Sequence, residues 1–358
     1  MKICFVGPAQ SAHIIKWCNW FAQHGHEIHV ISFTEGKIDN ATVHVIDAGL
    51  SGKETDLAKI KYLFHGRQIK KCIQQINPDI VNVHFATSYG ASAALGGLQN
   101  YILSVWGSDV YDFPKKSIFH KLLLKFSLKK ASYLFSTSKA MAEETRKYCT
   151  KEIYITPFGV DVQLFSPSNR SRDDHDFVIG TVKTLSPKYG IEYLLKAAAK
   201  IHRNNPDIPL KVRIAGKGTH EAEYKELAKQ LDISNITEWL GFISQPEAAH
   251  EWANMDVAVI PSTLDSESFG VSAVEAQSCG VPVIISDVPG LMEATQPDVS
   301  SIVVPRKNEE AIYTALVDLY NNPQKRKELG ENGRLHVCAD YEYNQCFERI
   351  EQFYRSVV

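Results

Sequence analysis

The stretch ESFGVSAVE, residues 267–275, decides how this chain folds locally, because two glutamates bracket a Phe-Gly pair and a short apolar run. Gly270 would weaken a helix that ran through the whole stretch. We therefore expect Glu267 in a loop and a helix that starts near Gly270 and ends at Gly280, a residue suited to a helix C-terminus. The apolar run DVAVIPS, residues 256–262, lies just upstream and is typical of a buried parallel strand.

This order of strand, loop and helix places the two glutamates at one edge of a sheet. In such units ligands bind beside the carboxyl end of the strand, where free N–H groups at the helix N-terminus attract phosphate. Glu267 would lie at that edge, and Glu275 about one turn into the helix. Carboxylates near a helix start are also favoured by the helix dipole alone, so their position does not by itself assign a function.

The composition indicates a soluble globular protein with two domains. The chain has 358 residues, of which 44% are hydrophobic and 22% charged. No apolar run approaches the roughly 18 residues of a membrane span, and MKICFVGPAQ enters a strand without the shape of a signal peptide. Seven cysteines, an odd number without a CxxC pair, indicate free thiols rather than zinc or disulfides. We therefore expect a cytoplasmic location.

The two halves of the chain differ in charge. Residues 1–165 carry 19 lysines and arginines against 13 acids, and residues 166–358 carry 20 against 28. The basic half suggests an anionic partner or surface. Within it, PKKSIFHKLLLKFSLKK, residues 114–130, has six lysines, no acid and apolar residues at helical spacing. This segment is either a domain helix with a solvated basic face or an interfacial helix drawn to anionic lipid at the inner face of the membrane.

Short apolar segments alternate with amphipathic ones, which is the pattern of parallel sheets covered on both faces. A polar linker, SPSNRSRDDHD, residues 166–176, interrupts this pattern. We predict an α/β fold of two doubly wound, Rossmann-like domains, 1–165 and 166–341, that face a central cleft. The segments predicted as strands are residues 2–7, 27–32, 43–47, 79–85, 101–107, 132–138, 153–157, 177–183, 210–216, 236–242, 257–262, 282–286 and 301–305.

Two lysines of the second domain lie where an anion would bind. The segment GTVKTLSPKYG, residues 180–190, follows the first strand of this domain and places Lys183 and Lys188 on the same side as the 267–275 loop. Two ammonium groups beside a helix N-terminus would bind a diphosphate and stabilise the charge that develops on it as a leaving group. Alone, the pair could be two solvated lysines in a turn, but the neighbouring glutamate loop favours the functional interpretation.

The first domain has candidate residues at the ends of its strands. The segment GPAQSAH, residues 7–13, lacks the GxGxxG fingerprint of dinucleotide sites, and His13 faces either the core or the cleft. His84 ends a strand, where a lone histidine is more often structural than catalytic. In WGSDVYDF, Asp109 suits either an Asx-type cap or a contact with sugar hydroxyls, and Trp106 could stack on a sugar ring.

Several segments together resemble one enzyme family. The stretch ESFGVSAVEAQSCGVPVIISDVPGLME, residues 267–293, is similar to the signature of retaining glycosyltransferases of family four, which have the GT-B fold. VKTLSPKYG resembles the family's Arg-Leu-x-x-x-Lys-Gly element, PFGVDVQLFSP (157–167) its linker, and HGHEIHVIS (24–32) a common second-strand entry. The chain has no Ser-His-Asp order, HExxH motif, P-loop or nucleic-acid motif.

The resemblance implies that a nucleotide-diphosphate sugar binds mainly to the second domain and that its sugar is transferred with retention, generally without a metal. Glu267 would contact the donor sugar near the reacting carbon and act with Lys188 in catalysis. Glu275 would hold the ribose hydroxyls, residues 241–243 would lie near the base, and a final helix, about 342–358, would pack on the first domain. The donor-binding residues implied are Gly7, Lys183, Lys188, Ile243, Phe269, Gly270, Val271, Ser272 and Glu275.

The chain departs from the family pattern at three points. Lys183 replaces the usual Arg, so bidentate contact with phosphate is lost. GPAQSAH lacks the usual Gly-Gly. Trp106 stands where many relatives have a His against the donor sugar, so it would instead shape an acceptor pocket, for which Asp109, His84 and His13 are the other candidates.

The resulting expectation is a retaining glycosyltransferase that acts on a polysaccharide-precursor, lipid-linked or other glycan acceptor, without a metal, another cofactor or nucleic acid. Two alternatives use the same fold: a sugar-nucleotide epimerase or hydrolase, and a non-catalytic partner subunit that binds the nucleotide sugar. A third alternative is an NAD-dependent oxidoreductase, against which the missing GxGxxG argues.

Overall fold

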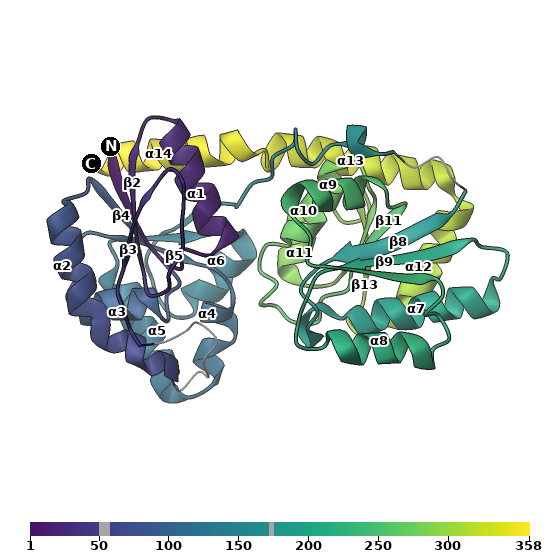
Figure 1. Ribbon diagram of the computed structural model, residues 1–358, viewed down its shortest axis with the longest axis horizontal. Coiled ribbons are helices and arrows are strands. Elements are labelled where there is room, and N and C mark those ends of the chain that lie inside the picture. Colours follow the sequence, from purple (N-terminus) through teal and green to yellow (C-terminus); the bar gives the residue numbers. More distant parts are fainter. Residues whose placement is uncertain (50–57, 172–174) are drawn as a thin grey trace. The chain divides into compact units, whose positions relative to one another are not determined.

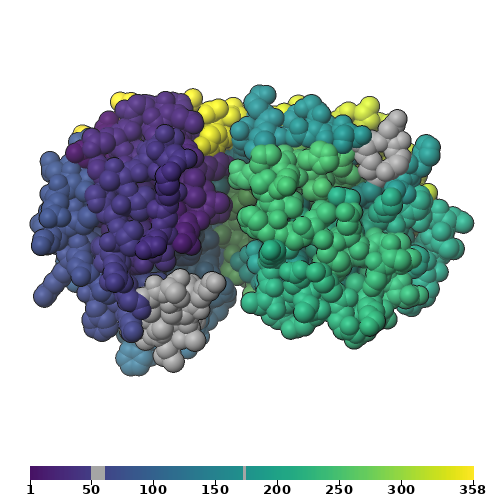
Figure 2. Space-filling model, in the orientation of Figure 1, coloured from purple at the N-terminus to yellow at the C-terminus, as the bar shows by residue number. Residues whose placement is uncertain are grey.

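The computed structural model of the chain describes residues 1–49, 58–171 and 175–358. Part of the predicted polar linker, residues 172–174, lies outside the described residues. The described chain forms two compact units (Figure 1): unit 1 consists of Met1–Phe158 with Phe347–Val358, and unit 2 of Gly159–Cys346. Figure 2 shows one face of the two units in space-filling form.

Unit 1 is built on a seven-stranded parallel sheet in the order β3-β2-β1-β4-β5-β6-β7. The chain starts in the middle, winds to one edge and then to the other, which is the doubly wound arrangement. The strands are β1 (Lys2–Val6), β2 (Glu27–Ser32), β3 (Thr42–Val45), β4 (Ile80–His84), β5 (Ile102–Val105), β6 (Tyr133–Ser136) and β7 (Ile153–Ile155). The helices are α1 (Ala12–Gln23), η1 (Ala58–His65), α2 (Gly66–Ile76), α3 (Tyr89–Leu95), α4 (Ser108–Tyr111), η2 (Phe113–Lys115), α5 (Ile118–Lys130), α6 (Lys139–Arg146) and the end of α14 (Tyr343–Val357).

Unit 2 repeats this plan with a six-stranded parallel sheet in the order β10-β9-β8-β11-β12-β13. Its strands are β8 (Phe177–Val182), β9 (Leu210–Ala215), β10 (Thr237–Gly241), β11 (Val257–Ile260), β12 (Val283–Ser286) and β13 (Ser301–Val304). Its helices are η3 (Pro167–Asn169), η4 (Pro187–Tyr189), α7 (Ile191–Asn204), α8 (Glu221–Gln230), α9 (Gln245–Ala253), α10 (Val271–Ser278), α11 (Pro289–Ala294), α12 (Glu309–Asn321) and α13 (Pro323–Asp340).

The predicted α/β fold is confirmed, because each of the predicted strand segments overlaps one of the observed strands. The helix predicted to start near Gly270 is α10. Gly270 precedes it with a φ of 75°, and Gly280 follows its last turn with a φ of 73°. Both angles lie in the left-handed region, which glycine adopts without the steric cost of a Cβ.

The segment from Gly159 onward belongs to unit 2 because its backbone is hydrogen-bonded there. The Val160 N–H donates to the carbonyl of Tyr341 at 2.8 Å. Arg334 donates to the carbonyls of Val162 at 3.0 Å and Phe165 at 2.8 Å. The units therefore divide at Gly159, earlier than the boundary at residue 165 that the polar linker suggested.

Helix α14 ends in unit 1, where its apolar face packs on α1. Phe347 lies 5.4 Å from the ring of Trp17, and the buried hydroxyl of Tyr354 donates to Asn82 Oδ1 at 2.6 Å. His26 Nε2 lies 3.0 Å from Glu351 Oε1. Within the residues that the structure describes, every helix is too short or too polar to cross a lipid bilayer.

The ion pair of Glu351 predicts a pH-dependent stability. Burial raises the pKa of Glu351, but hydrogen bonds from Arg355 and His26 outweigh burial and hold this pKa below its ordinary value of 4.5. The carboxylate thus stabilises the fold above pH 4.5, and this stabilisation is lost as the pH falls through the lowered pKa. In urea unfolding at pH 7, the wild type should be more stable than Glu351→Gln, and the difference should vanish in acid.

Glu348→Gln is the matched control, because Glu348 is exposed on the same helix. It should change the free energy of unfolding little at either pH. A difference between wild type and Glu351→Gln that persisted unchanged at about pH 3 would contradict the assignment.

Candidate functional site

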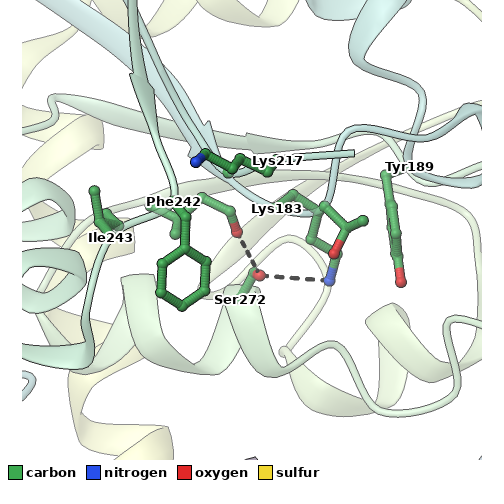
Figure 3. A pocket seen from close by; sticks show the side chains of 9 residues that line it. Lys183, Tyr189, Lys217, Phe242, Ile243 and Ser272 are labelled. Atoms are coloured by element: carbon green, nitrogen blue, oxygen red, sulfur yellow. Dashed lines mark hydrogen bonds between the residues drawn. The ribbon is translucent and has the colours of Figure 1, made fainter. Parts of the chain in front are cut away.

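A cavity of about 300 Å³ opens in unit 2 where β8, β9 and β10 end and α10 begins (Figure 3). Parallel sheets present ligand sites at this edge, beside helix N-termini. The cavity is lined by Val182, Lys183, Thr184, Tyr189, Gly216, Lys217, Phe242, Ile243 and Ser272. Sequence reasoning placed Lys183, Ser272 and Ile243 here.

Lys183 is the central cation of this cavity. Its Nζ donates to Glu267 Oε1 at 2.9 Å. The same Nζ donates to Ser272 Oγ at 3.4 Å, and Ser272 Oγ donates to the carbonyl of Val182 at 2.9 Å (Figure 3). The side chains of Lys183 and Glu267 are only 11% and 7% exposed. A buried pair of this kind contributes little net stability, so its presence at a strand end favours a function.

The charge state of Lys183 follows from these neighbours. Burial lowers the pKa of Lys183, but the negative charge of Glu267 and smaller contributions from Tyr189, from the hydrogen bond to Glu267 and from Glu275 together raise this pKa above 10.5. Lys183 is therefore an ammonium group at any physiological pH. It holds the Glu267 carboxylate in one orientation at the edge of the cavity.

Lys188 is held on the same loop system. Its Nζ donates to the carbonyl of Ser266 at 2.8 Å, and its own carbonyl accepts from the Thr263 N–H at 2.8 Å. The following Gly190 has a φ of 65°, and a Cβ there would lie 2.1 Å from the carbonyl oxygen of Pro261. Glycine is thus required at 190 for the lysine loop to approach the strand end of β11.

The N-terminus of α10 faces this loop. The first N–H groups of a helix have no partner within it, so residues 270–272 present donors to an anion. Phe269 is buried beneath, with its ring 5.3 Å from that of Tyr341. Val271 is half-buried. Lys183 therefore lies beside this N-terminus through its contact with Ser272, and Lys188 lies beside the loop that precedes it.

Glu275 lies one turn into α10 and is half-buried. The indole of Trp252 donates to Glu275 Oε2 at 3.3 Å and so fixes one oxygen of the carboxylate. Sequence reasoning missed Trp252, because nothing in α9 marks it as a neighbour of α10. It also missed Tyr189, Thr184 and Lys217. The nearest signals in the sequence were Lys188, which precedes Tyr189, and the segment GKG at residues 216–218, which contains Lys217.

In unit 1, Gly7 and His84 have structural roles. Gly7 is buried, and a Cβ there would lie 3.1 Å from Ile14 Cδ1 and 3.4 Å from His84 Cβ, so glycine serves close packing. His84 is fully buried, with its ring 5.0 Å from that of Trp17, and neither of its nitrogens has a hydrogen-bond partner among the described residues. Burial, with the nearby His13, lowers the pKa of His84 to about 3. It is a neutral core residue rather than an acceptor contact.

Asp109 also has a structural role. It is 1% exposed, and its carboxylate accepts the backbone N–H groups of Gly107 at 2.8 Å, Ala86 at 2.9 Å and Trp106 at 3.1 Å. Burial raises the pKa of Asp109, and these hydrogen bonds oppose the rise. These bonds come from residues that precede Asp109, and helix α4 has no side-chain cap at Gly107, so the Asx-type cap weighed from the sequence is not observed.

Trp106 and His13 remain candidates, because both are half-buried at strand ends of unit 1. Their rings lie 5.5 Å apart, and His13 stacks on Phe158 at 3.9 Å with an angle of 11° between the rings. Together they form an aromatic cluster beside β1 and β5. Across the described parts of the chain, no three His, Cys, Asp or Glu side chains are grouped so that they could hold a metal ion.

Two Rossmann-like units in one chain are the plan of the GT-B fold. Residues 164–336 match the profile of the glycosyl transferases group 1, and residues 2–138 match that of glycosyl transferase 4-like proteins. Both halves of the chain are therefore similar to glycosyl transferases, and the second half is similar to group 1.

Individual relatives agree with this assignment. The D-inositol 3-phosphate glycosyltransferase of Pseudarthrobacter chlorophenolicus is 33% identical over 218 residues, which are 58% of this chain and 51% of that protein. A GDP-mannose-dependent monoacylated alpha-(1-6)-phosphatidylinositol monomannoside mannosyltransferase of Corynebacterium glutamicum is 30% identical over 215 residues, 56% of this chain and 55% of its own. The chain thus spans about half the length of these curated relatives.

Solved structures show the same fold over the whole chain. Sucrose-phosphate synthase from Thermosynechococcus elongatus superimposes with a TM-score of 0.83 at 17% identity and covers 100% of this chain and 99% of its own. Anabaena HepE, solved in complex with UDP, has a TM-score of 0.78 at 17% identity. This match covers 99% of our chain and 100% of HepE. At this level of identity the likeness establishes the GT-B fold.

The close approach at Gly190 predicts the effect of a single methyl group. Gly190→Ala should lower the free energy of unfolding by about 2–4 kcal/mol, because the new Cβ meets both an unfavourable φ and the carbonyl of Pro261. Gly25→Ala is the matched control, since Gly25 has a φ of 81° and nothing within 4 Å of the new Cβ, and should cost only about 1–2 kcal/mol. Chemical denaturation measures both, and equal losses would show that the contact with Pro261 is unimportant.

Proposed function

We propose that this protein is a retaining glycosyltransferase, which moves a sugar from a nucleotide-diphosphate sugar to a glycan acceptor. The observation that carries the proposal is the cavity of unit 2, which is lined by Lys183 and by Ser272 at the start of α10. Glu267 pairs with Lys183, and Lys188 is held nearby on the carbonyl of Ser266. The match of residues 164–336 to the glycosyl transferases group 1 and the UDP bound to the structural relative HepE support a nucleotide sugar as the donor.

The diphosphate is the part of the donor that this cavity fits best. The two ammonium groups and the free N–H groups of α10 would bind its oxygens. The same groups would stabilise the negative charge that develops on the diphosphate as the glycosidic bond breaks. We also propose that catalysis needs no metal ion, because the lysines supply the positive charge that a cation would otherwise provide.

The two glutamates have different roles in this proposal. Glu267 lies at the cavity edge and is oriented by Lys183, which suits contact with the donor sugar near the reacting carbon. Glu275 lies deeper in α10 and is oriented by Trp252, which suits hydrogen bonds to the ribose hydroxyls. Ile243 would lie against the base. The acceptor would meet Trp106 and His13 of unit 1, which offer an aromatic surface for a sugar ring.

We further propose that the acceptor is a polysaccharide precursor or a lipid-linked glycan and that the protein works at the inner face of a membrane. The support is the outer side of α5. Leu124 and Leu128 pack into unit 1, whereas Ile118, Phe119 and Leu122 are 61%, 78% and 55% exposed. Exposed apolar residues of this size, side by side, mark an interaction surface.

Lysines surround these apolar residues. We define the α5 patch as Ile118, Phe119 and Leu122 together with the exposed Lys115, Lys116, Lys121 and Lys125. Residues 113–130 contain no acid. Apolar side chains that enter the headgroup region beside cations that attract anionic lipid are the features of an interfacial helix. The seven free cysteines fit a reducing compartment on that side of the membrane.

Thermal shifts with nucleoside diphosphates test the donor site. UDP, GDP, ADP, CDP and dTDP are compared, and the matching ligand at about a hundred times its dissociation constant should add roughly 2.7 kcal/mol of stability. Glu275→Ala should lose this shift. Glu267→Gln should keep most of it but lower the transfer rate about a hundredfold or more, since Glu267 acts near the reacting carbon.

Glu238→Ala is the control for both variants, because Glu238 pairs with Arg213 on the surface of β10, outside the cavity. If the turnover of Glu267→Gln is unchanged, Glu267 has no catalytic role. If no nucleoside diphosphate causes a thermal shift, the protein does not bind nucleotide sugars. Consumption of the donor without an acceptor would indicate a hydrolase or epimerase.

Vesicle binding tests the α5 patch. At low salt the protein should bind vesicles of phosphatidylcholine mixed with phosphatidylglycerol more tightly than phosphatidylcholine alone. Lys121→Gln with Lys125→Gln should weaken the binding by about 2 kcal/mol, roughly thirtyfold, and Phe119→Ser should weaken it further. Leu335→Ser is the matched control, because Leu335 is 69% exposed on α13. Equal binding by the lysine variant and the control would contradict the membrane proposal.

A further inference from the structure

Tyr189 lines the cavity and lies close to two lysines, Lys183 of the cavity and the neighbouring Lys188. Lys183 Nζ is 4.7 Å from the centre of the Tyr189 ring, and Lys188 Nζ is 5.2 Å from it. Both distances are within the roughly 6 Å over which an aromatic face attracts a cation. Figure 3 shows the ring along one side of the cavity, facing Lys183. One aromatic ring thus lies within cation–π distance of two ammonium groups.

The surrounding structure fixes the ring. Tyr189 ends the short helix η4, and its N–H donates to the carbonyl of Ser186 at 3.0 Å. The carbonyls of Pro187 and Lys188, on the same turn, accept the Thr263 hydroxyl at 3.1 and 3.2 Å. The side chain packs against the core of unit 2. The ring is therefore held by the fold and does not need the lysines to keep its place.

The lysines, in contrast, need such a support. A lysine is a point charge on a flexible four-carbon stem, whereas an arginine offers a rigid planar fork. Two ammonium groups that must act on one diphosphate also repel each other while the site is empty. A shared aromatic face offsets part of that repulsion and removes part of the rotamer freedom that phosphate binding would otherwise cost.

We infer that Tyr189 is a positioning residue, whose ring holds Lys183 and Lys188 together as a clamp for the diphosphate of the donor. This inference rests on the proposed function and deepens it, since it explains how a chain with lysine at 183 binds a diphosphate without a bidentate arginine. The ring acts through its face, so the hydroxyl is dispensable. The hydroxyl is also un-ionised, because burial raises the pKa of Tyr189 and Glu267 raises it further, against the opposing effect of Lys183.

Calorimetric titration of the full chain with inorganic pyrophosphate, and with the nucleoside diphosphate and monophosphate of the base that binds best, tests this role. Tyr189→Leu should weaken pyrophosphate and nucleoside diphosphate about tenfold, and the monophosphate much less. Tyr189→Phe keeps the ring and should stay within about twofold of the wild type. Tyr189→Gln is a second ringless variant and should behave like Tyr189→Leu.

Tyr193→Leu is the matched control, because Tyr193 also carries a lysine, Lys196 at 5.2 Å, but on α7 and outside the cavity. It should leave all affinities unchanged. The inference is overturned if the ringless variants bind the diphosphate as the wild type does, if they lose diphosphate and monophosphate equally, or if Tyr189→Phe is as weak as Tyr189→Leu. A wild type that binds neither pyrophosphate nor any nucleoside diphosphate overturns the proposed function itself.

Discussion

The ion pair between Lys183 and Glu267 is the interaction on which the arrangement of the cavity depends. It ties the end of β8 to the loop before α10, two segments that meet only because β8 and β11 are neighbours in the sheet. A tetrahedral ammonium can donate in three directions, whereas a guanidinium directs its donors within one plane. Lys183 uses this freedom to contact a carboxylate, the hydroxyl of Ser272 and the face of Tyr189 at once. The replacement of arginine therefore changes the geometry of the site and keeps its charge.

The strand ends of unit 1 show how similar residues take different roles. Asp109 and His84 occupy positions where a ligand would be expected, yet both are buried and belong to the packing of the loops. Trp106 and His13 lie beside them and keep part of their surface exposed. Burial, and not residue type or position at a strand end, separates the two pairs. A carboxylate that is fully engaged by backbone N–H groups stabilises a loop and has no capacity left for a sugar hydroxyl.

The strands and the α10 loop could be predicted from the sequence for a physical reason. Strands of a covered parallel sheet are buried on both faces and read as short apolar runs, and glycines at 270 and 280 mark the two ends of the helix between them. Contacts between segments far apart in the chain could not be predicted in this way. Trp252 contacts Glu275 from a different helix, and the sequence does not indicate that Lys183 lies over the ring of Tyr189. The apolar residues of α5 had the spacing of a helix, but the sequence did not tell which of them would pack inward.

The charge distribution shows that a site can have the opposite charge from the domain that contains it. The second half of the chain has 20 basic against 28 acidic residues, yet its cavity is the one suited to an anion. At physiological salt the charges of exposed acids are screened over about 8 Å, so distant carboxylates weaken anion binding little. The buried Lys183 is screened much less and acts on the cavity at contact distance. Net charge therefore says little about this site, whereas Lys183, held by the Glu267 carboxylate and close to the Tyr189 ring, gives the cavity its local positive charge.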